Sequence, residues 1–504
     1  MNRRTFLAGA ALSATGSLLH DFASAQRIDP WSEGFARALA ANPYLTGYQG
    51  VGPDTLFDSE VAFEGTLPDG LQGTFYRNGP ALHEISGLRY HHWFDGDGMV
   101  QSFSIGGGRL VHKGRLVLTE KLQAEIKAGK RVRGAFGTTI PGADPITSPD
   151  ALNVANTSIL SHANALLALW EGGSAYRLES HTLATLGPKV WRSDLKGLPF
   201  SAHPKVEADG ELWNFGLDTL GSQLVLYRIS SAGEVIAAAT LRIPDMAMVH
   251  DFAVTAKHLV FLLPPLRISL EKLRAGVSFN ESHDWIADAP LRVLVVEKSD
   301  LGVYRLFELP PGFVFHFGNA WEDAGGIIRF DYVRADDAHN LGIGFRNVMR
   351  GVQTVSHPAL ATQVSLDPNM GRVSQTQIAG SVEFPRVDGR VVGKRYRQLY
   401  HAARLSLPRE QVGFDGIRRF DLETGETDAF SYGDGTLVEE HVFVPDRAST
   451  REGAGWFIGT ALDLKRGQTV LSVFDAMALN AGPLAYARLP YALPLGLHGN
   501  FEGA

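Results

Sequence analysis

Residues 292–297 read RVLVVE, a short run of β-branched and aliphatic residues bounded by charged and turn-forming positions. Similar runs recur at residues 224–229 (LVLYRI), 258–263 (HLVFLL) and 469–475 (TVLSVFD). Helical patterns are few, and the 55 glycines and 25 prolines suit short strands joined by turns. The chain is therefore predicted to be large and all-β. Because no clean internal repeat is visible, a propeller, a jelly roll and a double sandwich all remain open.

Length and charge narrow the class of protein. A chain of 504 residues, 44% of them hydrophobic, is long enough to bury a large core, and no linker divides it. The net charge of −7, without a basic run, argues against nucleic-acid binding. No glycine-rich phosphate-binding loop opens a helix. We expect a small organic substrate.

The first twenty-five residues look like an export signal. Arg3 and Arg4 precede a moderately apolar stretch that ends at Leu19, and residues 23–25 (ASA) form a small-x-small cleavage pattern. This pattern predicts a twin-arginine signal peptide over residues 1–25, a single mature domain over residues 26–504 and a periplasmic location. The alternative is a membrane anchor, but the apolar run is shorter than the roughly twenty residues that a spanning helix needs.

The sequence contains no cysteine. Cysteine nucleophiles, thiolate metal sites and iron–sulfur clusters are therefore excluded, and histidine and carboxylate side chains are the ligands that remain for a metal ion.

Four histidines lie in separate, strand-like, apolar contexts: His203, His250, His316 and His498. A buried imidazole is costly unless its nitrogens find partners, and one shared transition metal would satisfy all four. Neutral imidazoles favour iron, copper, zinc or nickel over calcium or magnesium, and four of them leave two octahedral positions open. The residues alone do not choose among these metals.

Other conspicuous motifs are interpreted as structural. Residues 95–98 (DGDG) resemble half of a calcium loop but lack the later glutamate, so a glycine-rich turn explains them more simply. Residues 77–80 (RNGP) are interpreted as a turn with a buried arginine pairing. His91 and His92 are adjacent, so on a strand their side chains would face opposite ways and could not easily share one ion.

Two long stretches precede the histidine segments, residues 73–80 (GTFYRNGP) and 92–99 (HWFDGDGM). Together with the four histidine segments in this order, they resemble the carotenoid cleavage oxygenase family, which also includes stilbenoid-cleaving dioxygenases and retinoid isomerohydrolases. The resemblance runs from about Gly50 to Phe501. It implies a seven-bladed β-propeller whose loops and short helices cap one face, with one Fe(II) per chain on the axis.

The resemblance also implies roles for individual residues. It places Fe(II) on the four histidines and matches three glutamates to partners of the ligand imidazoles: Glu171, Glu383 and Glu440. Such carboxylates accept the imidazole's other N–H and offset the charge of the ion.

The chain departs from the family pattern at Leu118, where relatives often have arginine, and at Phe317-Gly318, where they often have a second histidine. Tyr90 and Lys121 resemble the stilbenoid-cleaving branch, in which a tyrosine and a lysine hold a phenolic hydroxyl group. A packed tyrosine and a solvated lysine are the alternative.

Two classes of function follow. The first is a non-haem iron dioxygenase that uses O2 to split a conjugated C=C bond of a carotenoid, apocarotenoid or stilbene-like substrate into two carbonyl products. The second is a non-catalytic metal-binding propeller that binds a ligand or partner protein. The complete set of four histidines and three glutamates favours the enzyme. The substrate, the bond cleaved, the oligomeric state and any peripheral membrane contact remain open.

Overall fold

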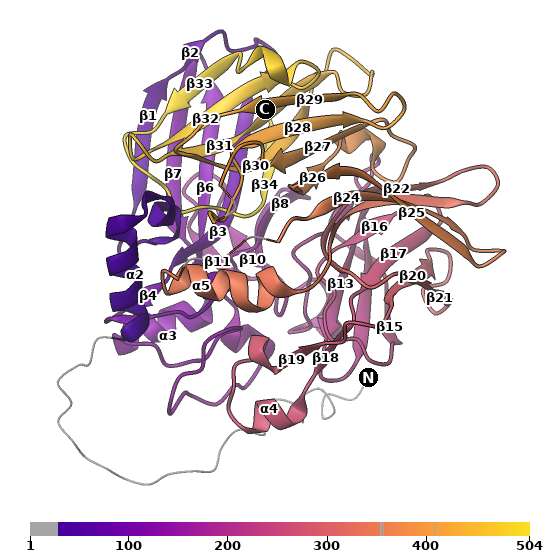
Figure 1. Ribbon diagram of the computed structural model, residues 1–504, viewed down its shortest axis with the longest axis horizontal. Coiled ribbons are helices and arrows are strands. Elements are labelled where there is room, and N and C mark those ends of the chain that lie inside the picture. Colours follow the sequence, from indigo (N-terminus) through magenta and orange to yellow (C-terminus); the bar gives the residue numbers. More distant parts are fainter. Residues whose placement is uncertain (1–28, 353–354, 356, 409) are drawn as a thin grey trace.

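The computed structural model describes residues 29–352, 355, 357–408 and 410–504. These residues form seven antiparallel sheets of four or five strands, arranged as blades around a central axis (Figure 1), and two further two-stranded ribbons. The prediction of a seven-bladed propeller is confirmed. The predicted signal peptide, residues 1–25, lies outside the described residues and stays a prediction.

Each blade starts with the strand nearest the axis and continues outward. In chain order, the first blade consists of β8 (Ser158–His162), β9 (Ala165–Leu169), β10 (Tyr176–Leu178) and β11 (Thr185–Pro188). The second consists of β12 (Lys205–Val206), β13 (Leu212–Asp218), β14 (Gln223–Ile229) and β15 (Val235–Arg242). The third consists of β16 (Phe252–Val254), β17 (His258–Leu263), β20 (Leu291–Glu297) and β21 (Tyr304–Leu309). The next two are β22 (Phe313–Glu322), β23 (Ile328–Ala335), β24 (Leu360–Asp367) and β25 (Arg372–Gly380); and β26 (Val382–Arg386), β27 (Gln398–Ala403), β28 (Gly416–Asp421) and β29 (Thr427–Ser431).

The last two blades close the ring by combining the two ends of the chain. One of them consists of β30 (Thr436–Pro445), β31 (Gly455–Asp463), β32 (Gln468–Asp475), β33 (Ala485–Arg488) and β2 (Glu64–Gly65). The other consists of β34 (Gly499–Gly503), β3 (Gly73–Leu82), β6 (Asp97–Gly106), β7 (Arg109–Leu116) and β1 (Phe57–Ala62). Because an early strand completes a late blade and the last strand completes an early one, no blade edge is left open at the junction.

The core lies between neighbouring blades rather than on the axis. Phe252 of β16 stacks on Phe261 of β17, and both contact Phe215 of β13 in the next blade edge to face. Such buried aromatic contacts hold one sheet face against the next. The first strands of adjacent blades contact one another around the axis, as β16, β22, β26 and β30 do in turn.

Helices and loops cover one side of the sheets (Figure 1). The α-helices are α2 (Pro30–Ala41), α3 (Glu120–Ala128), α4 (Leu270–Arg274) and α5 (Phe345–Met349), and the ribbons are β4 (Glu84–Ile85) with β5 (Leu88–Arg89) and β18 (Leu266–Ile268) with β19 (His283–Trp285). Thr119 caps α3 by accepting a hydrogen bond from Leu122 N, and Gly129 ends it in the left-handed conformation. None of the described helices is long and apolar enough to cross a membrane.

Candidate metal centre

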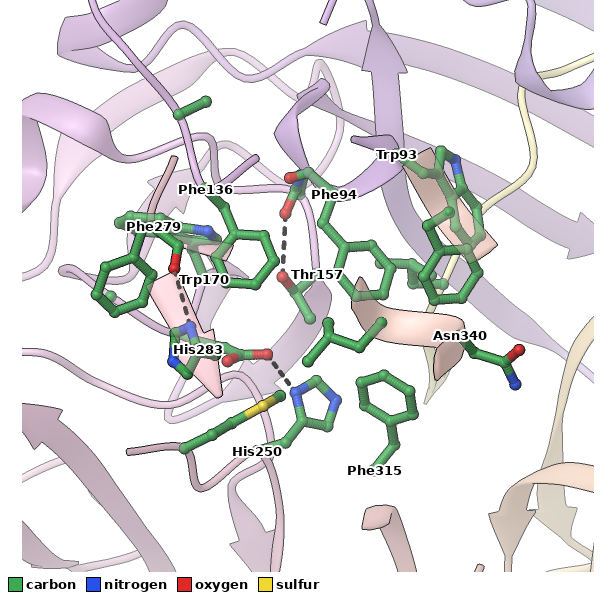
Figure 2. Close-up of a pocket in the computed structure, with 18 of the residues that line it drawn as sticks. Trp93, Phe94, Phe136, Thr157, Trp170, His250, Phe279, His283, Phe315 and Asn340 are labelled. Carbon is green, nitrogen blue, oxygen red and sulfur yellow. Dashed lines mark hydrogen bonds and ion pairs between the residues drawn. The ribbon is translucent and has the colours of Figure 1, made fainter. Parts of the chain in front are cut away.

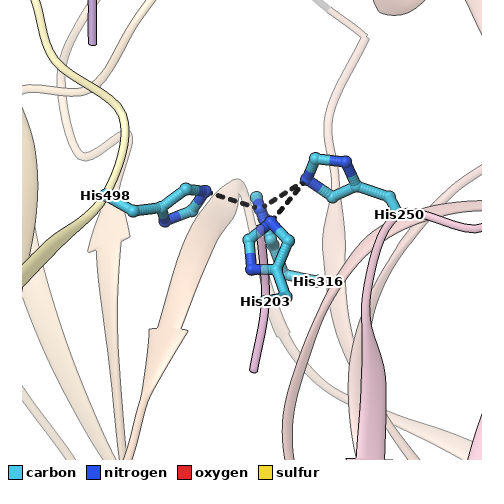
Figure 3. A group of neighbouring side chains, drawn as sticks. All are labelled: His203, His250, His316 and His498. Carbon is cyan, nitrogen blue, oxygen red and sulfur yellow. Dashed lines mark hydrogen bonds between the residues drawn. The ribbon is translucent and has the colours of Figure 1, made fainter. Parts of the chain in front are cut away.

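The four predicted ligand histidines converge on the propeller axis (Figure 3). Each lies within or just before the first strand of a different blade: His203 before β12, His250 before β16, His316 in β22 and His498 before β34. One ring nitrogen from each lies within 4.8 Å of those of the others. Histidines that are up to 295 residues apart in sequence thus share one point, because first strands meet only at the axis.

The facing atoms are the Nε2 nitrogens. The Nε2–Nε2 distances are 3.0 Å from His203 to His250, 3.2 Å from His250 to His316 and 3.1 Å from His316 to His498. The side chains of His250, His316 and His498 are buried, and that of His203 is partly exposed.

Three glutamates occupy the opposite side of three of the rings. His250 Nδ1 pairs with Glu171, His316 Nδ1 lies 2.5 Å from Glu383 and His498 Nδ1 lies 2.9 Å from Glu440. An ionised carboxylate can only accept, so each of these Nδ1 nitrogens donates, and in the neutral ring Nε2 is then the nitrogen with a lone pair for a cation. These are the three glutamates that the family resemblance matched to the ligand imidazoles.

The described residues offer His203 no carboxylate partner. Its own backbone N–H donates to Ser201 Oγ at 3.1 Å, and its ring meets the ring of His498 edge to face. The site therefore combines three imidazole–carboxylate pairs with one unpaired imidazole.

The electrostatics of the rings favour binding of a cation. Burial, aided by the other three histidines and Lys205, holds the pKa of His203 well below its ordinary value. Burial also lowers the pKa of His498 to about 4, against the opposing effect of Glu440. Burial lowers the pKa of His250 too, but the charge and hydrogen bond of Glu171 outweigh it and raise the pKa above its ordinary value. Neutral rings with converging lone pairs are the form that binds a metal ion.

Glu440 is held more firmly than a single imidazole could hold it. Arg386 donates to both of its oxygens, at 2.9 and 2.7 Å, and Gly499 N donates to Oε2 at 2.7 Å. Burial would raise the pKa of Glu440, but Arg386 and His498 outweigh burial and lower it to about 2. This carboxylate is therefore ionised at neutral pH.

Irregularities in the first strands aim these side chains. The pairing register shifts between Val314 and Phe317, around His316, and again between Glu383 and Arg386. A third shift, between Val438 and His441, falls at Glu440. A bulge turns a side chain away from the regular alternation of a strand, which lets an axial strand direct an imidazole or carboxylate at one point.

A cavity of about 1880 Å³ adjoins the histidines (Figure 2). His250, His316 and His498 line it, as do Glu171 and Glu383. The walls are otherwise rich in aromatic side chains, which include Trp93, Phe94, Phe136, Trp170, Phe279 and Phe315. This volume exceeds the common range for small-molecule sites and suits a long apolar ligand.

The sequence did not identify these wall residues. They come from the cap segments 134–149 and 270–283 as well as from the blades, so they share no spacing along the chain. Trp93 and Phe94 lie in the stretch 92–99, and Phe315 is next to His316.

The comparisons with known proteins agree with this geometry. A family model described as retinal pigment epithelial membrane protein matches residues 53–503. The chain belongs to the carotenoid oxygenase family.

The names of relatives within this family indicate different substrates. The chain is 32% identical to apocarotenoid-15,15'-oxygenase of Synechocystis, over 94% of this chain and 98% of the relative. It is 30% identical to lignostilbene-α,β-dioxygenase isozyme III of Sphingomonas paucimobilis, over 89% and 94%. Cobalt-substituted Synechocystis ACO is a solved structure with a TM-score of 0.81 and 30% identity, covering 92% of this chain and 98% of its own.

Tyr90 and Lys121 lie away from the cavity of this carotenoid oxygenase family member. Both are fully buried, and neither is among the described residues that line the cavity. Lys121 Nζ contacts the Tyr90 hydroxyl group and lies 3.0 Å from Asp97 and 3.2 Å from Glu125. The polar atoms of this pair already belong to a closed ionic cluster, so the structure does not support the expectation that the pair holds a phenolic substrate, which stays a prediction.

Arg131 completes that cluster. Its guanidinium donates to Tyr90 at 2.8 Å and to Asp97 and Glu125 at 2.7 Å. Two cations thus balance two carboxylates, and each oxygen of Asp97 accepts from one of them. Asp97 and Gly98 lie in β6, so only Asp95 and Gly96 of the predicted turn precede the strand.

The remaining motifs also have structural roles. Arg77 lies within strand β3, so the predicted turn at residues 77–80 is wrong, but its guanidinium forms the predicted buried pairing, with Glu439. His91 stacks on Trp31, and His92 Nε2 lies 2.8 Å from Leu341 O. Neither joins the metal centre.

Proposed function

We propose that the protein is an Fe(II)-dependent dioxygenase that cleaves a conjugated C=C bond of an apolar substrate with O2, giving two carbonyl products. The observation that carries the proposal is the convergence of four Nε2 nitrogens at the wall of a large aromatic cavity. The family's named relatives, an apocarotenoid oxygenase and a lignostilbene dioxygenase, support the same reaction class.

His203, His250, His316 and His498 would hold the iron, which supplies the binding and activation of O2. Glu171, Glu383 and Glu440 fix the Nδ1 proton of three ligand rings and place negative charge near the ion. No protein nucleophile or general base is required. The cavity walls exclude water and hold the double bond beside the open side of the histidine cluster.

The structure favours an apocarotenoid or similar polyene over a hydroxystilbene. The phenol-holding role of Tyr90 and Lys121 was the argument for a stilbenoid, and both residues are enclosed in the ionic cluster. Leu220 and Leu270 line the cavity and are about half exposed, which supports an apolar entrance and contact with a membrane surface from which such a substrate could be drawn.

The test has two parts. Purified protein should contain one iron per chain, and mass spectrometry should detect two aldehyde or ketone fragments from an apocarotenal, each carbonyl oxygen derived from O2. Replacing any one of the four histidines by Ala should abolish turnover and lower bound iron. Equal turnover by a metal-free protein would refute the proposal.

His401→Ala is the matched control. His401 is a fully buried histidine on β27, outside the cavity, so its loss imposes a comparable folding cost without removing a ligand. We expect this variant to keep its iron and its turnover per folded molecule.

We further propose export to the periplasm by the twin-arginine route, on the strength of residues 1–25. Arg3→Lys/Arg4→Lys should trap the protein in the cytoplasm, as cell fractionation would show. Unchanged export would contradict the proposal.

A further inference from the structure

Asp251 lies where three of the ligand-bearing segments meet. Its carboxylate is buried, and Lys205 Nζ approaches Oδ1 to 2.7 Å. Phe317 N donates to Oδ2 at 2.8 Å, and Phe252 N donates to Oδ1 at 2.7 Å. One side chain therefore contacts residues of β12, β16 and β22.

Each of these contacts is next to a predicted metal ligand. Asp251 directly follows His250, Phe317 directly follows His316, and Lys205 is two residues after His203. No other described carboxylate contacts the segments of three ligand histidines at once. The carboxylate therefore fixes the spacing between the three backbones that carry these rings.

Two of the three strands, β12 and β16, are too short to fix that spacing alone, whereas β22 has ten residues. β12 contributes two residues and pairs only through Lys205 and Val206, and β16 contributes three residues. Strands of two or three residues form few ladder hydrogen bonds, and each pairs with its own blade rather than with the next. The charge-assisted bonds to Asp251 supply the connection between blades that the ladders lack.

We propose that Asp251, with Lys205, is a positioning residue of the metal centre that holds the His203, His250 and His316 segments at the separation a single ion requires. The inference rests on the metal ligands assigned under the proposed function. His498 is held by a different device, since Gly499 N donates to Glu440 and Arg386 donates to Gly499 O at 2.9 Å. Loss of Asp251 should therefore loosen three ligands and leave the fourth in place.

Asp251→Asn is the primary variant. An amide keeps the shape but loses the charge toward Lys205, and its NH2 group cannot accept from Phe317 N. We expect the Kd for Co(II), measured by titration against a chelator, to rise about 10- to 100-fold, as for other groups that orient metal ligands. The visible spectrum of the Co(II) protein should change, and kcat of the iron protein should fall more than KM rises.

Asp428→Asn is the matched control. Asp428 is a buried carboxylate on β29 that accepts from Leu479 N at 2.7 Å and Asn480 N at 3.0 Å, far from the axis. It should lose a similar amount of unfolding free energy and keep the wild-type Kd and spectrum. If Asp251→Asn folds poorly, Lys205→Met removes the same ion pair from a side chain that is partly exposed, and it should weaken Co(II) binding in the same direction.

The double variant tests whether the pair acts as a unit, because Asp251→Asn/Lys205→Met should bind Co(II) no more weakly than Asp251→Asn alone. A wild-type Kd and spectrum in both single variants would overturn the inference, as would a loss of affinity no larger than that of Asp428→Asn. Cobalt binding is measured without substrate, so failure of the proposed cleavage reaction would appear separately, as a metal-loaded wild-type protein without turnover.

Discussion

At the scale of single residues, the three glutamates beside the histidines are not equivalent. Glu171 borders the cavity with 36% of its side chain exposed, whereas Glu440 is 3% exposed and also binds Arg386. Removing the charge of Glu440 would leave a partly buried guanidinium without its partner as well as an imidazole. The same change at Glu171 would affect the imidazole alone.

We therefore expect Glu171→Gln and Glu440→Gln each to weaken metal binding by about 10- to 100-fold, because glutamine loses the charge that offsets the ion. Only Glu440→Gln should also lower the unfolding free energy of the metal-free protein, by about 1–3 kcal/mol. Chelator competition and urea denaturation measure the two effects. Glu423→Gln, at an exposed surface ion pair, is the control for charge loss alone. Equal loss of stability in Glu171→Gln and Glu440→Gln would contradict the proposed difference between these two glutamates.

Lys121 gives a second residue-scale prediction. Lys121→Met removes one of the two cations that balance Asp97 and Glu125, and breaking a buried ionic cluster costs about 3–5 kcal/mol. We expect lower stability to urea with an unchanged ratio of activity on an apocarotenal and a 4-hydroxystilbene. Lys113→Met, at a more exposed position on β7, should be nearly neutral. Selective loss of stilbene turnover would instead place Lys121 in contact with substrate.

The sequence identified the ligand residues more reliably than the surroundings of Lys121. Four histidines in apolar strands could be grouped because one shared ion would satisfy all four imidazoles and because the stretches that precede them resemble the family. The burial of Lys121 depends on Glu125, one turn further along α3, and on Asp97 and Arg131, which lie outside that helix. A single lysine carries no local signal that separates a closed ionic cluster from a substrate contact.

At the scale of elements, strands could be predicted but their bulges could not. β22, β26 and β30 each shift register at the residue that serves the metal centre, and no one residue type marks the three shifts. Phe384, next to Glu383, adopts φ +54 and stacks on His316. A positive φ at phenylalanine is unfavourable and is imposed by tertiary packing, so no local propensity predicts it.

Asp95 connects the cap segment 134–149 to the rest of the protein. Its carboxylate accepts from Gly137 N at 2.8 Å and Thr138 Oγ1 at 2.6 Å, and so ties the cavity-lining segment 134–149 to the blades. Burial raises the pKa of Asp95 to about 6, although these hydrogen bonds and the nearby Lys121 and Arg131 oppose the rise.

In the folded protein Asp95 therefore binds a proton more tightly than in the unfolded chain, and its contribution to stability falls as pH rises from about 4 to about 6. Asp95→Asn does not titrate and should lack this slope. The unfolding free energy of the wild type relative to the variant should fall by at most about 3 kcal/mol across that window. Urea denaturation at a series of pH values measures it. A difference independent of pH would show that Asp95 is ionised in both states.

At the scale of the whole molecule, composition and strand spacing led only to a large all-β fold. Seven blades leave no sequence period when each has diverged and the connections differ in length, so family resemblance was needed to specify a propeller. The sequence also gives no sign of how the ring closes, because β2 and β34 are short segments that join blades built mostly from the opposite end of the chain. Since His498 immediately precedes β34, the same closure brings the fourth histidine to the axis.

An engineered disulfide across the closure tests this arrangement. Thr74 of β3 and Glu502 of β34 are directly paired, and opposed Cα atoms in antiparallel strands lie within the range that a disulfide spans. The chain has no cysteine, so Thr74→Cys/Glu502→Cys would contain a single possible bond. It should form in the folded protein and stabilise it by about 2–4 kcal/mol, since it links distant parts of the chain.

The measurement is the unfolding temperature of the double variant with and without reductant, together with thiol titration. Each single variant is a control, and Thr74→Cys also accounts for the lost hydrogen bond between Thr74 and Ser104. Only the oxidised double variant should unfold at a higher temperature, and it should keep its bound metal because β34 already lies in this blade. Two free thiols in the oxidised, folded protein would mean that β34 does not pair with β3 and that the ring closes elsewhere.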